Sequence, residues 1–223
     1  MTAIVCLGDS VTQGLGGNGV QHAESDRWPS VLAQATGAAV YNRGIGGETT
    51  AMALDRFHTQ VAPLLPATVL IAFAINDCYV CPWRSGPRVG LAEFRRNLAE
   101  LGAWTVRLGG TPVLIAPHRM AEQAHAQGNG ATLAANLEPY AAAVVEVAAE
   151  HGWNAIDLRS ALAPGDLDGD GVHLTPMGSR HYGAIVAAAL NQRYNPRRSI
   201  GCGSAEAREC GSSVDTGFSV SPR

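Results

Sequence analysis

Lysine is absent from the chain, and all 16 basic residues are arginine. Without a lysine amine the protein cannot form a Schiff base, use a Ser-Lys pair, or bind phosphate through a Walker A lysine. Charged residues are scarce at 16%, the formal net charge at pH 7 is -3, and no basic run would bind a nucleic-acid backbone. We therefore expect no nucleic-acid partner.

Cysteines, long apolar runs and export signals are scarce as well. Five cysteines in 223 residues do not make the dense, even set of a small disulfide-rich secreted domain. No run of apolar residues is long enough to span a membrane, and the N-terminal segment lacks the features of a signal peptide. These absences predict a cytoplasmic protein. The hydrophobic content of 46% is nevertheless enough for a buried core, and the length predicts one domain.

Short, β-branched apolar runs alternate with one-sided helical patterns along the chain. Buried parallel strands are predicted at residues 3–7, 38–41, 68–75, 112–116 and 154–158. Apolar spacing predicts helices at residues 28–36, 91–108, 132–151 and 177–193. The alternation predicts a three-layer α/β/α fold with a doubly wound, mostly parallel, five-stranded sheet. We expect this domain over residues 1–193, followed by a flexible tail rich in Ser and Gly over residues 194–223.

The loop after the first strand carries a candidate nucleophile. Ligands of such sheets bind at the carboxyl ends of the strands. There the chain reads Gly8-Asp9-Ser10, which places a hydroxyl beside the unpaired N–H groups of a helix start. Gly8 allows a tight exit from the strand. A serine that merely caps a helix explains the same tripeptide.

Two further loops offer donors for a negatively charged oxygen. The second strand is followed by Gly44, Gly46 and Gly47, where an exposed N–H can serve as a donor or the glycines simply permit a turn. The third strand leads to Asn76-Asp77, whose Asn76 amide donates without carrying charge, although such pairs also form ordinary turns.

A carboxylate and an imidazole lie three residues apart in the polar loop before the last helix. A base that accepts a serine proton needs an acceptor at its second ring nitrogen. Asp170 meets this need for His173 if Gly171 permits a tight turn. Five histidines without such a neighbour are interpreted as side chains that are exposed at the surface or have their hydrogen-bonding groups paired: His22, His58, His125, His151 and His181.

Together, these four blocks in this order resemble the SGNH/GDSL hydrolase superfamily over about residues 1–193. The resemblance implies the flavodoxin-like fold of these hydrolases, and we expect neither cofactor nor metal. It assigns roles to residues already singled out: Ser10 as nucleophile, His173 as general base and acid, Asp170 as its orienting acid, and the Ser10 N–H, Gly47 N–H and Asn76 side chain as oxyanion hole. Gly44 and Gly46 remain alternatives for Gly47.

The resemblance also implies an activity. We expect a serine hydrolase that cleaves carboxylic esters of short acyl chains through an acyl-enzyme, with a small-molecule ester as its partner. Carbohydrate O-deacetylation is the alternative, followed by lysophospholipase or thioesterase activity. The chain departs from the family where Ala74 replaces the glycine of the third block, and this methyl group favours small acyl groups.

The substrate pocket is expected between two long loops, residues 78–90 and 118–130, which leave carboxyl strand ends. Met120 belongs to the second of these loops. Trp83 can bind substrate or act as a structural plug. The substrate-binding candidates are Asp9, Tyr79, Trp83 and His118.

Three motifs favour other classes of protein. Residues 14–19 match the dinucleotide-binding pattern G-x-G-x-x-G, so a nucleotide-binding module is the alternative from another class of protein. However, the match begins beyond the end of the first strand, and no acidic residue follows the second strand. Asp166, Asp168 and Asp170 match the start of a calcium loop that has no acid at its twelfth position. Cys78 and Cys81 have redox or zinc spacing without a nearby second pair, which favours two thiols or one local disulfide.

Overall fold

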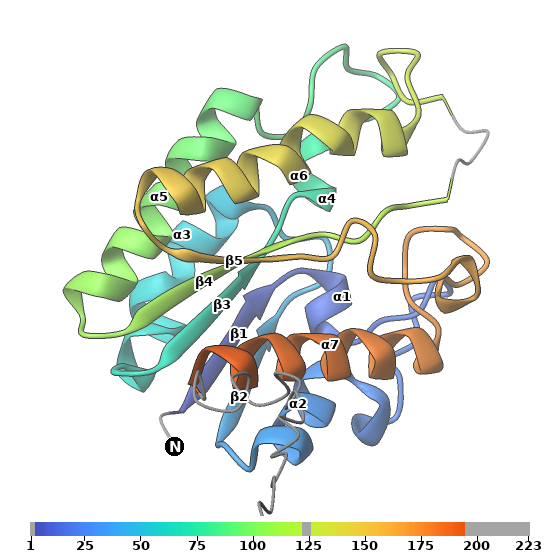
Figure 1. Ribbon diagram of the computed structural model, residues 1–223. Coiled ribbons are helices and arrows are strands. Elements are labelled where there is room, and N and C mark those ends of the chain that lie inside the picture. Colours follow the sequence, from blue (N-terminus) through green and yellow to red (C-terminus); the bar gives the residue numbers. More distant parts are fainter. Residues whose placement is uncertain (1–2, 122–125, 195–223) are drawn as a thin grey trace, which may run out of the picture.

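The structure of the protein is a computed structural model that describes residues 3–121 and 126–194 (Figure 1). Its centre is a parallel sheet in the order β2-β1-β3-β4-β5. The five strands are β1 (Ile4–Gly8), β2 (Val40–Gly44), β3 (Thr68–Ala72), β4 (Thr111–Ala116) and β5 (Asn154–Asp157). The strand order changes direction at β1, which places the loops after β1 and β3 side by side at the carboxyl edge.

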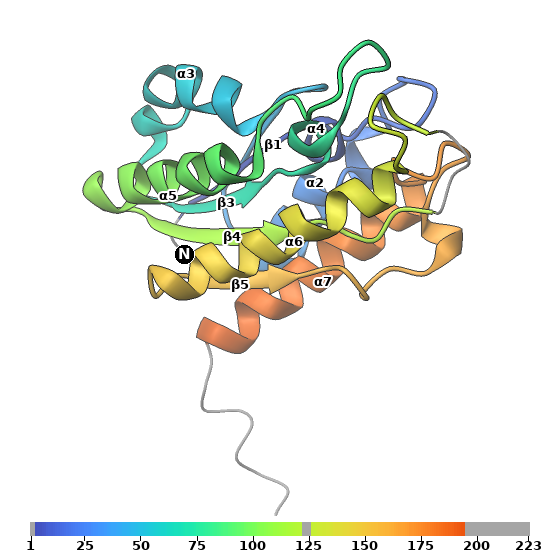
Figure 2. The ribbon, with the colours of Figure 1, turned by 90° about the horizontal axis from the view of Figure 1, so that it is seen from above.

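Helices cover both faces of the sheet. On one face α5 (Leu91–Arg107) packs between α3 (Thr50–Gln60) and α6 (Leu133–Glu150), as Figure 2 shows. On the other face α2 (Trp28–Thr36) packs against α7 (Pro176–Tyr194). The short elements are α1 (Ser10–Gln13), α4 (Ile75–Cys78), η1 (Glu24–Asp26), η2 (Ala62–Leu64) and η3 (Pro164–Asp166). The predicted three-layer α/β/α fold is therefore confirmed.

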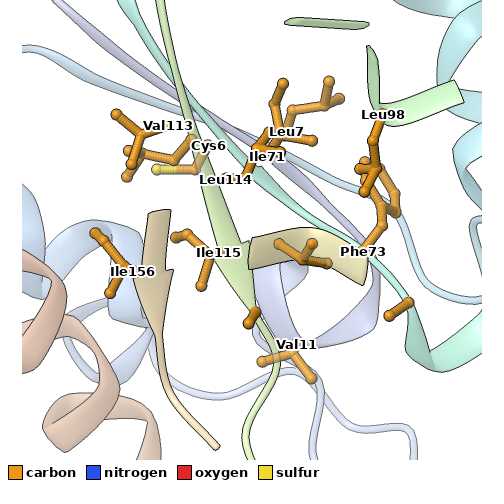
Figure 3. Close-up of a cluster of buried hydrophobic side chains, with 14 of the residues drawn as sticks. Cys6, Leu7, Val11, Ile71, Phe73, Leu98, Val113, Leu114, Ile115 and Ile156 are labelled. Atoms are coloured by element: carbon orange, nitrogen blue, oxygen red, sulfur yellow. The ribbon is translucent and has the colours of Figure 1, made fainter. Parts of the chain in front are cut away.

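The core lies on both faces of the central strands. All five residues of β1 are buried, and Figure 3 shows Cys6 and Leu7 of this strand among side chains of its neighbours, such as Ile71 and Leu114. Burial on both faces explains why these strands are continuous apolar runs rather than alternating ones. The prediction of buried strands is wrong for β2 and β5, which form the sheet edges and are partly exposed.

The predicted element boundaries differ from the structure in a few places. The second strand begins and ends later than predicted, at residues 40–44, and the third ends at Ala72 rather than at residue 75. Helix α3 was not predicted. The four predicted helices are present with ends shifted by no more than one residue. The predicted tail lies outside the described residues apart from Tyr194, which ends α7.

Candidate active site

Ser10 is the first residue of α1, directly past the carboxyl end of β1. The Asp9 side chain caps the helix by accepting a hydrogen bond from the backbone N–H of Val11 at 3.0 Å. A Cβ atom at Gly8 would lie 2.2 Å from Oγ1 of Thr12 and 2.7 Å from the carbonyl oxygen of Ala72. Only glycine therefore allows the chain to turn so tightly from strand into helix, and the role predicted for Gly8 is confirmed.

The structure brings His173 and Asp170 to this serine. Nε2 of His173 lies 2.9 Å from Oγ of Ser10, and Nδ1 lies 2.6 Å from Oδ2 of Asp170. The other carboxylate oxygen of Asp170 accepts hydrogen bonds from the backbone N–H groups of Val172 and His173, both at 2.9 Å. Gly171 makes the predicted tight turn with a φ of 68°.

The environment of Asp170 favours its charged form. Partial burial raises the pKa of this carboxyl group, but the hydrogen bonds from His173 and Val172 outweigh it and hold the pKa below its usual range. Asp170 therefore stays ionised at neutral pH and can stabilise a positive charge on the imidazole.

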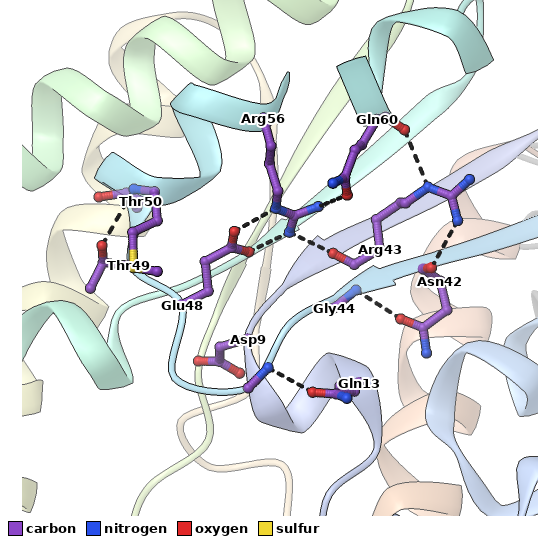
Figure 4. A network of polar contacts seen from close by, with 12 residues as sticks. Asp9, Gln13, Asn42, Arg43, Gly44, Glu48, Thr49, Thr50, Arg56 and Gln60 are labelled. Carbon is purple, nitrogen blue, oxygen red and sulfur yellow. Dashed lines mark hydrogen bonds and ion pairs between the residues drawn. The ribbon is translucent and has the colours of Figure 1, made fainter. Parts of the chain in front are cut away.

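The structure distinguishes among the three glycines of the loop after β2. The N–H of Gly44 donates to Oδ1 of Asn42 at 2.9 Å, and the N–H of Gly46 donates to Oε1 of Gln13 at 2.6 Å (Figure 4). The N–H of Gly47 has no acceptor among the residues that the structure describes, and this glycine is exposed with a φ of 75°. Gly47 thus keeps a free donor in this loop.

Asn76 supplies a second free donor. It lies in α4, and its Nδ2 atom is buried without a hydrogen-bond acceptor among the described residues. An unpaired buried donor destabilises a protein, so such atoms commonly mark functional positions. Ser10 adds a third donor, because the N–H of a first helical residue has no acceptor within its helix.

A buried hydrogen-bond network connects the loops that carry Gly47 and Asn76. Oδ1 of Asp77 accepts from the backbone N–H of Thr50 at 2.9 Å and from its hydroxyl at 2.5 Å. Asn97 of α5 donates to the same hydroxyl at 3.0 Å. Burial raises the pKa of Asp77 to about 6, against the opposing effect of the bonds from Thr50. The network fixes the start of α3 relative to α4.

Glu48 and Arg56 lie against the glycine-rich loop that follows β2. Both are buried and form a two-bond ion pair, and Nη2 of Arg56 also donates to the carbonyl oxygen of Arg43 at 2.7 Å (Figure 4). Sequence reasoning missed these residues and the Asp77 network. The signal available for Glu48 and Arg56 was two opposite charges eight positions apart beside a glycine-rich loop, which is weak.

Two predicted substrate-binding residues are buried. Asp9 is 2% exposed and His118 is 1% exposed. His118 donates from Nε2 to the carbonyl oxygen of Val172 at 2.9 Å, and burial lowers the pKa of His118. A neutral His118 thus supports the backbone of the loop that carries His173.

The predicted pocket loops contribute to a cavity of about 630 Å³ beside Asp170 and Val172. Its wall includes Tyr79 and Met120, one from each loop. Trp83 is 82% exposed, so it is not a structural plug. Ala74 is fully buried, so its methyl group does not face an open pocket and gives no support to a preference for small acyl groups.

The competing motifs have other structural explanations. Residues 14–19 follow α1 instead of β1, and Gly16 and Gly17 among them lie against Asp168 and Asp170. Asp166 binds Nδ1 of His181 at 2.7 Å, whereas Asp168 accepts from the backbone N–H of Gly17 at 2.8 Å. Cys78 and Cys81 are free thiols.

Comparison with known proteins identifies the family. Residues 6–181 match the GDSL-like lipase/acylhydrolase family. The chain belongs to this family. A curated relative, the uncharacterized lipoprotein YqeF of Bacillus subtilis (strain 168), is 32% identical over 114 residues. These residues cover 50% of this chain and 46% of that protein, so the chain spans about half the length of its relative.

Solved structures share the fold. A lipase/acylhydrolase from Enterococcus faecalis has a TM-score of 0.70 at 26% identity and covers 86% of this chain and 97% of its own. A carbohydrate acetylesterase from Sinorhizobium meliloti has a TM-score of 0.71 at 16% identity, with coverages of 86% and 100%. The native aryl esterase of M. smegmatis has a TM-score of 0.69 at 20% identity, with coverages of 86% and 99%.

Among residues 3–121 and 126–194, no helix combines the length and the apolar character needed to cross a membrane. The cytoplasmic location expected from the sequence stays a prediction, because the relative from Bacillus subtilis is described as a lipoprotein.

Proposed function

We propose that the protein hydrolyses carboxylic esters through a catalytic triad of Ser10, His173 and Asp170. The observation that carries this proposal is the continuous path from Oγ of Ser10 through the His173 ring to Asp170, with distances of 2.9 and 2.6 Å. Ser10 and His173 are 163 positions apart in the sequence. A pairing of this geometry between distant loops is what a serine nucleophile and its base require.

The reaction has two halves. Oγ of Ser10 attacks the ester carbonyl carbon as its proton passes to Nε2 of His173, and Asp170 stabilises the imidazolium. The tetrahedral intermediate collapses to an acyl-enzyme, and the departing alkoxide takes the proton from His173. Water then attacks the acyl-enzyme in the same way, which releases the carboxylic acid and restores the Ser10 hydroxyl.

The negative oxygen of each intermediate is stabilised by the N–H groups of Ser10 and Gly47 and by Nδ2 of Asn76. The absence of an acceptor for the Gly47 N–H and for Nδ2 of Asn76 among the described residues supports this assignment, because such donors can stabilise developing charge without first breaking another hydrogen bond. Gly44 and Gly46 are less suited, because their N–H groups are already bonded to Asn42 and Gln13.

For the substrate we propose esters of short acyl chains, with acetylated carbohydrates as the alternative. The fold is shared with a carbohydrate acetylesterase and an aryl esterase, both of which are named for esters. The cavity beside Val172 is of a size that holds small organic ligands, and Tyr79 and Met120 in its wall offer apolar contact.

The triad is tested by substitution and covalent labelling. We expect Ser10→Ala to lower kcat on a nitrophenyl ester by about 10⁴- to 10⁶-fold and to abolish fluorophosphonate labelling. Asn76→Ala should lower kcat by only about 10²- to 10³-fold, because one oxyanion donor is lost. Ser25→Ala, at an exposed position of η1, is the matched control and should keep full activity. Substantial esterase activity in Ser10→Ala would refute the triad.

The substrate class is tested with nitrophenyl esters of increasing chain length alongside acetylated xylan and acetylated sugars. We expect kcat/KM to be highest for the shortest acyl chains. Acetate release from the carbohydrates with no turnover of simple esters would replace the first choice of substrate by the second.

A further inference from the structure

The glycine-rich loop between α1 and η1 has a role that the dinucleotide pattern does not explain. Its residues 15–21 form a small hairpin, in which Leu15 and Gln21 pair antiparallel and the N–H of Gly16 donates to the carbonyl oxygen of Val20 at 2.9 Å. The hairpin directly follows the helix that begins with Ser10. A segment that contacts the hairpin is therefore linked through α1 to Ser10.

The hairpin and the residue that follows it, His22, contact the loop of residues 166–175, which carries Asp170 and His173. The backbone N–H of Gly17 donates to Oδ2 of Asp168 at 2.8 Å, and Nε2 of His22 lies 3.0 Å from the carbonyl oxygen of Leu174. The backbone N–H of Asp168 in turn donates to the carbonyl oxygen of His173 at 2.7 Å. Asp168 thus joins the hairpin to the backbone of His173.

Gly17 lies against the carboxylate of Asp170. A Cβ atom at Gly17 would lie 2.8 Å from Cγ, 3.0 Å from Oδ2 and 3.1 Å from Oδ1 of Asp170. Side chains do not approach so closely, so any residue other than glycine at this position would have to displace the carboxylate. The φ of Gly17 is not in the left-handed region, unlike those of Gly14 and Gly19, so the backbone conformation alone does not require glycine here.

We propose that Gly17 is a positioning residue for Asp170. Because Gly17 has no side chain, its backbone confines the carboxylate to the place where Oδ2 accepts the hydrogen bond from Nδ1 of His173. Asp168 holds the hairpin in this position through the bond from the Gly17 N–H. The inference rests on the proposed function of Ser10, His173 and Asp170.

The substitution Gly17→Ala tests this role. The added methyl group displaces the Asp170 carboxylate from Nδ1 of His173, so the imidazolium formed during catalysis loses part of its stabilisation. We expect kcat to fall by about 10- to 100-fold with KM nearly unchanged, as for a misplacement of about 1 Å in a catalytic group. Protonation of His173 becomes less favourable, so the acid limb of the pH profile of kcat/KM should move to lower pH.

Gly165→Ala is the control glycine substitution, because Gly165 lies in the connection between β5 and α7 that also carries Asp170, and no heavy atom lies within 4 Å of its Cβ position. Its kinetics and pH profile should match those of the wild type. Asp168→Ala is the second variant and leaves Gly17 intact while releasing the hairpin. We expect it to shift the acid limb in the same direction by a smaller amount.

Two outcomes would overturn the role of Gly17 while Ser10→Ala remains inactive. One is a Gly17→Ala enzyme with the kinetics and pH profile of the Gly165→Ala control. The other is a loss of activity with a lowered Tm but an unmoved acid limb, which marks a purely structural glycine. An active Ser10→Ala enzyme would instead refute the proposed function.

Discussion

At the scale of single residues, Asp9 shows what burial next to a nucleophile does to a carboxyl group. Burial raises its pKa from 3.8 to about 7, against the hydrogen bond from the N–H of Val11, and the nearby carboxylate of Asp77 adds to the rise. The folded protein therefore binds this proton more tightly than the unfolded chain does. The stabilisation from that proton is complete below pH 3.8 and is lost as the pH rises through about 7.

The substitution Asp9→Asn removes this titration and keeps an oxygen that can accept the bond from Val11. Between pH 5 and pH 8, the free energy of unfolding of the wild type should fall relative to that of Asp9→Asn by roughly 2 to 3 kcal/mol. Urea unfolding of both proteins at the two pH values measures this difference. A difference that stays constant with pH would show that Asp9 is charged in the folded protein throughout this range.

At the scale of the secondary-structure elements, the junction of β3 and α4 contains backbone strain. Ala74 has a φ of 146°, in a region that residues with a side chain rarely adopt. Such strain destabilises a protein by about 1 to 3 kcal/mol, whereas the buried methyl group contributes about 0.8 kcal/mol of stability. Glycine at this position, as in the family pattern, avoids the strain.

We therefore expect Ala74→Gly to raise the free energy of unfolding by about 1 kcal/mol. Urea unfolding at a single pH, with Ala72→Gly in the adjacent strand as control, measures this effect. The control should be destabilised, because glycine weakens a regular strand. Destabilisation of both variants to the same degree would show that Ala74 is not strained.

The same junction explains which elements the sequence predicted and which it did not. The third strand was predicted to continue to residue 75 because Phe73, Ala74 and Ile75 are apolar, but the φ of Ala74 ends the strand and starts α4. Helix α3 was missed because Arg56 lies on its buried side, paired with Glu48, where the helical pattern expects an apolar residue. Local apolar spacing cannot reveal a buried ion pair.

At the scale of the whole molecule, the sequence predicted where the site lies but not what supports it. Ser10, His173 and Asp170 could be placed together because the loops at the carboxyl ends of parallel strands converge. The bond from Thr50 to Asp77 and the contact of Gly17 with Asp170 depend on how the loops pack on one another. No spacing within one segment determines such packing between distant segments.

This packing extends from the site to the core on one face of the sheet. The backbone N–H of Trp28, which begins α2, donates to Oγ of Ser179 in α7 at 3.0 Å. The buried ring of Trp28 lies 5.1 Å from that of Tyr182, measured between ring centroids. The helix that follows the hairpin is thus packed against the helix that follows the loop of His173, so this loop should not separate from Ser10 while the two helices stay packed.

Esterase activity and tertiary structure should therefore be lost in a single urea transition. We expect the same midpoint for activity and for tryptophan fluorescence, recorded in a Trp83→Phe background because Trp83 is 82% exposed and reports little on the core. Activity lost at a clearly lower urea concentration than fluorescence would mean that the loop carrying His173 opens while α2 and α7 remain packed. The hydrogen bonds that Gly17 and His22 make with that loop would then be too weak to hold His173 beside Ser10, even with α2 and α7 still packed.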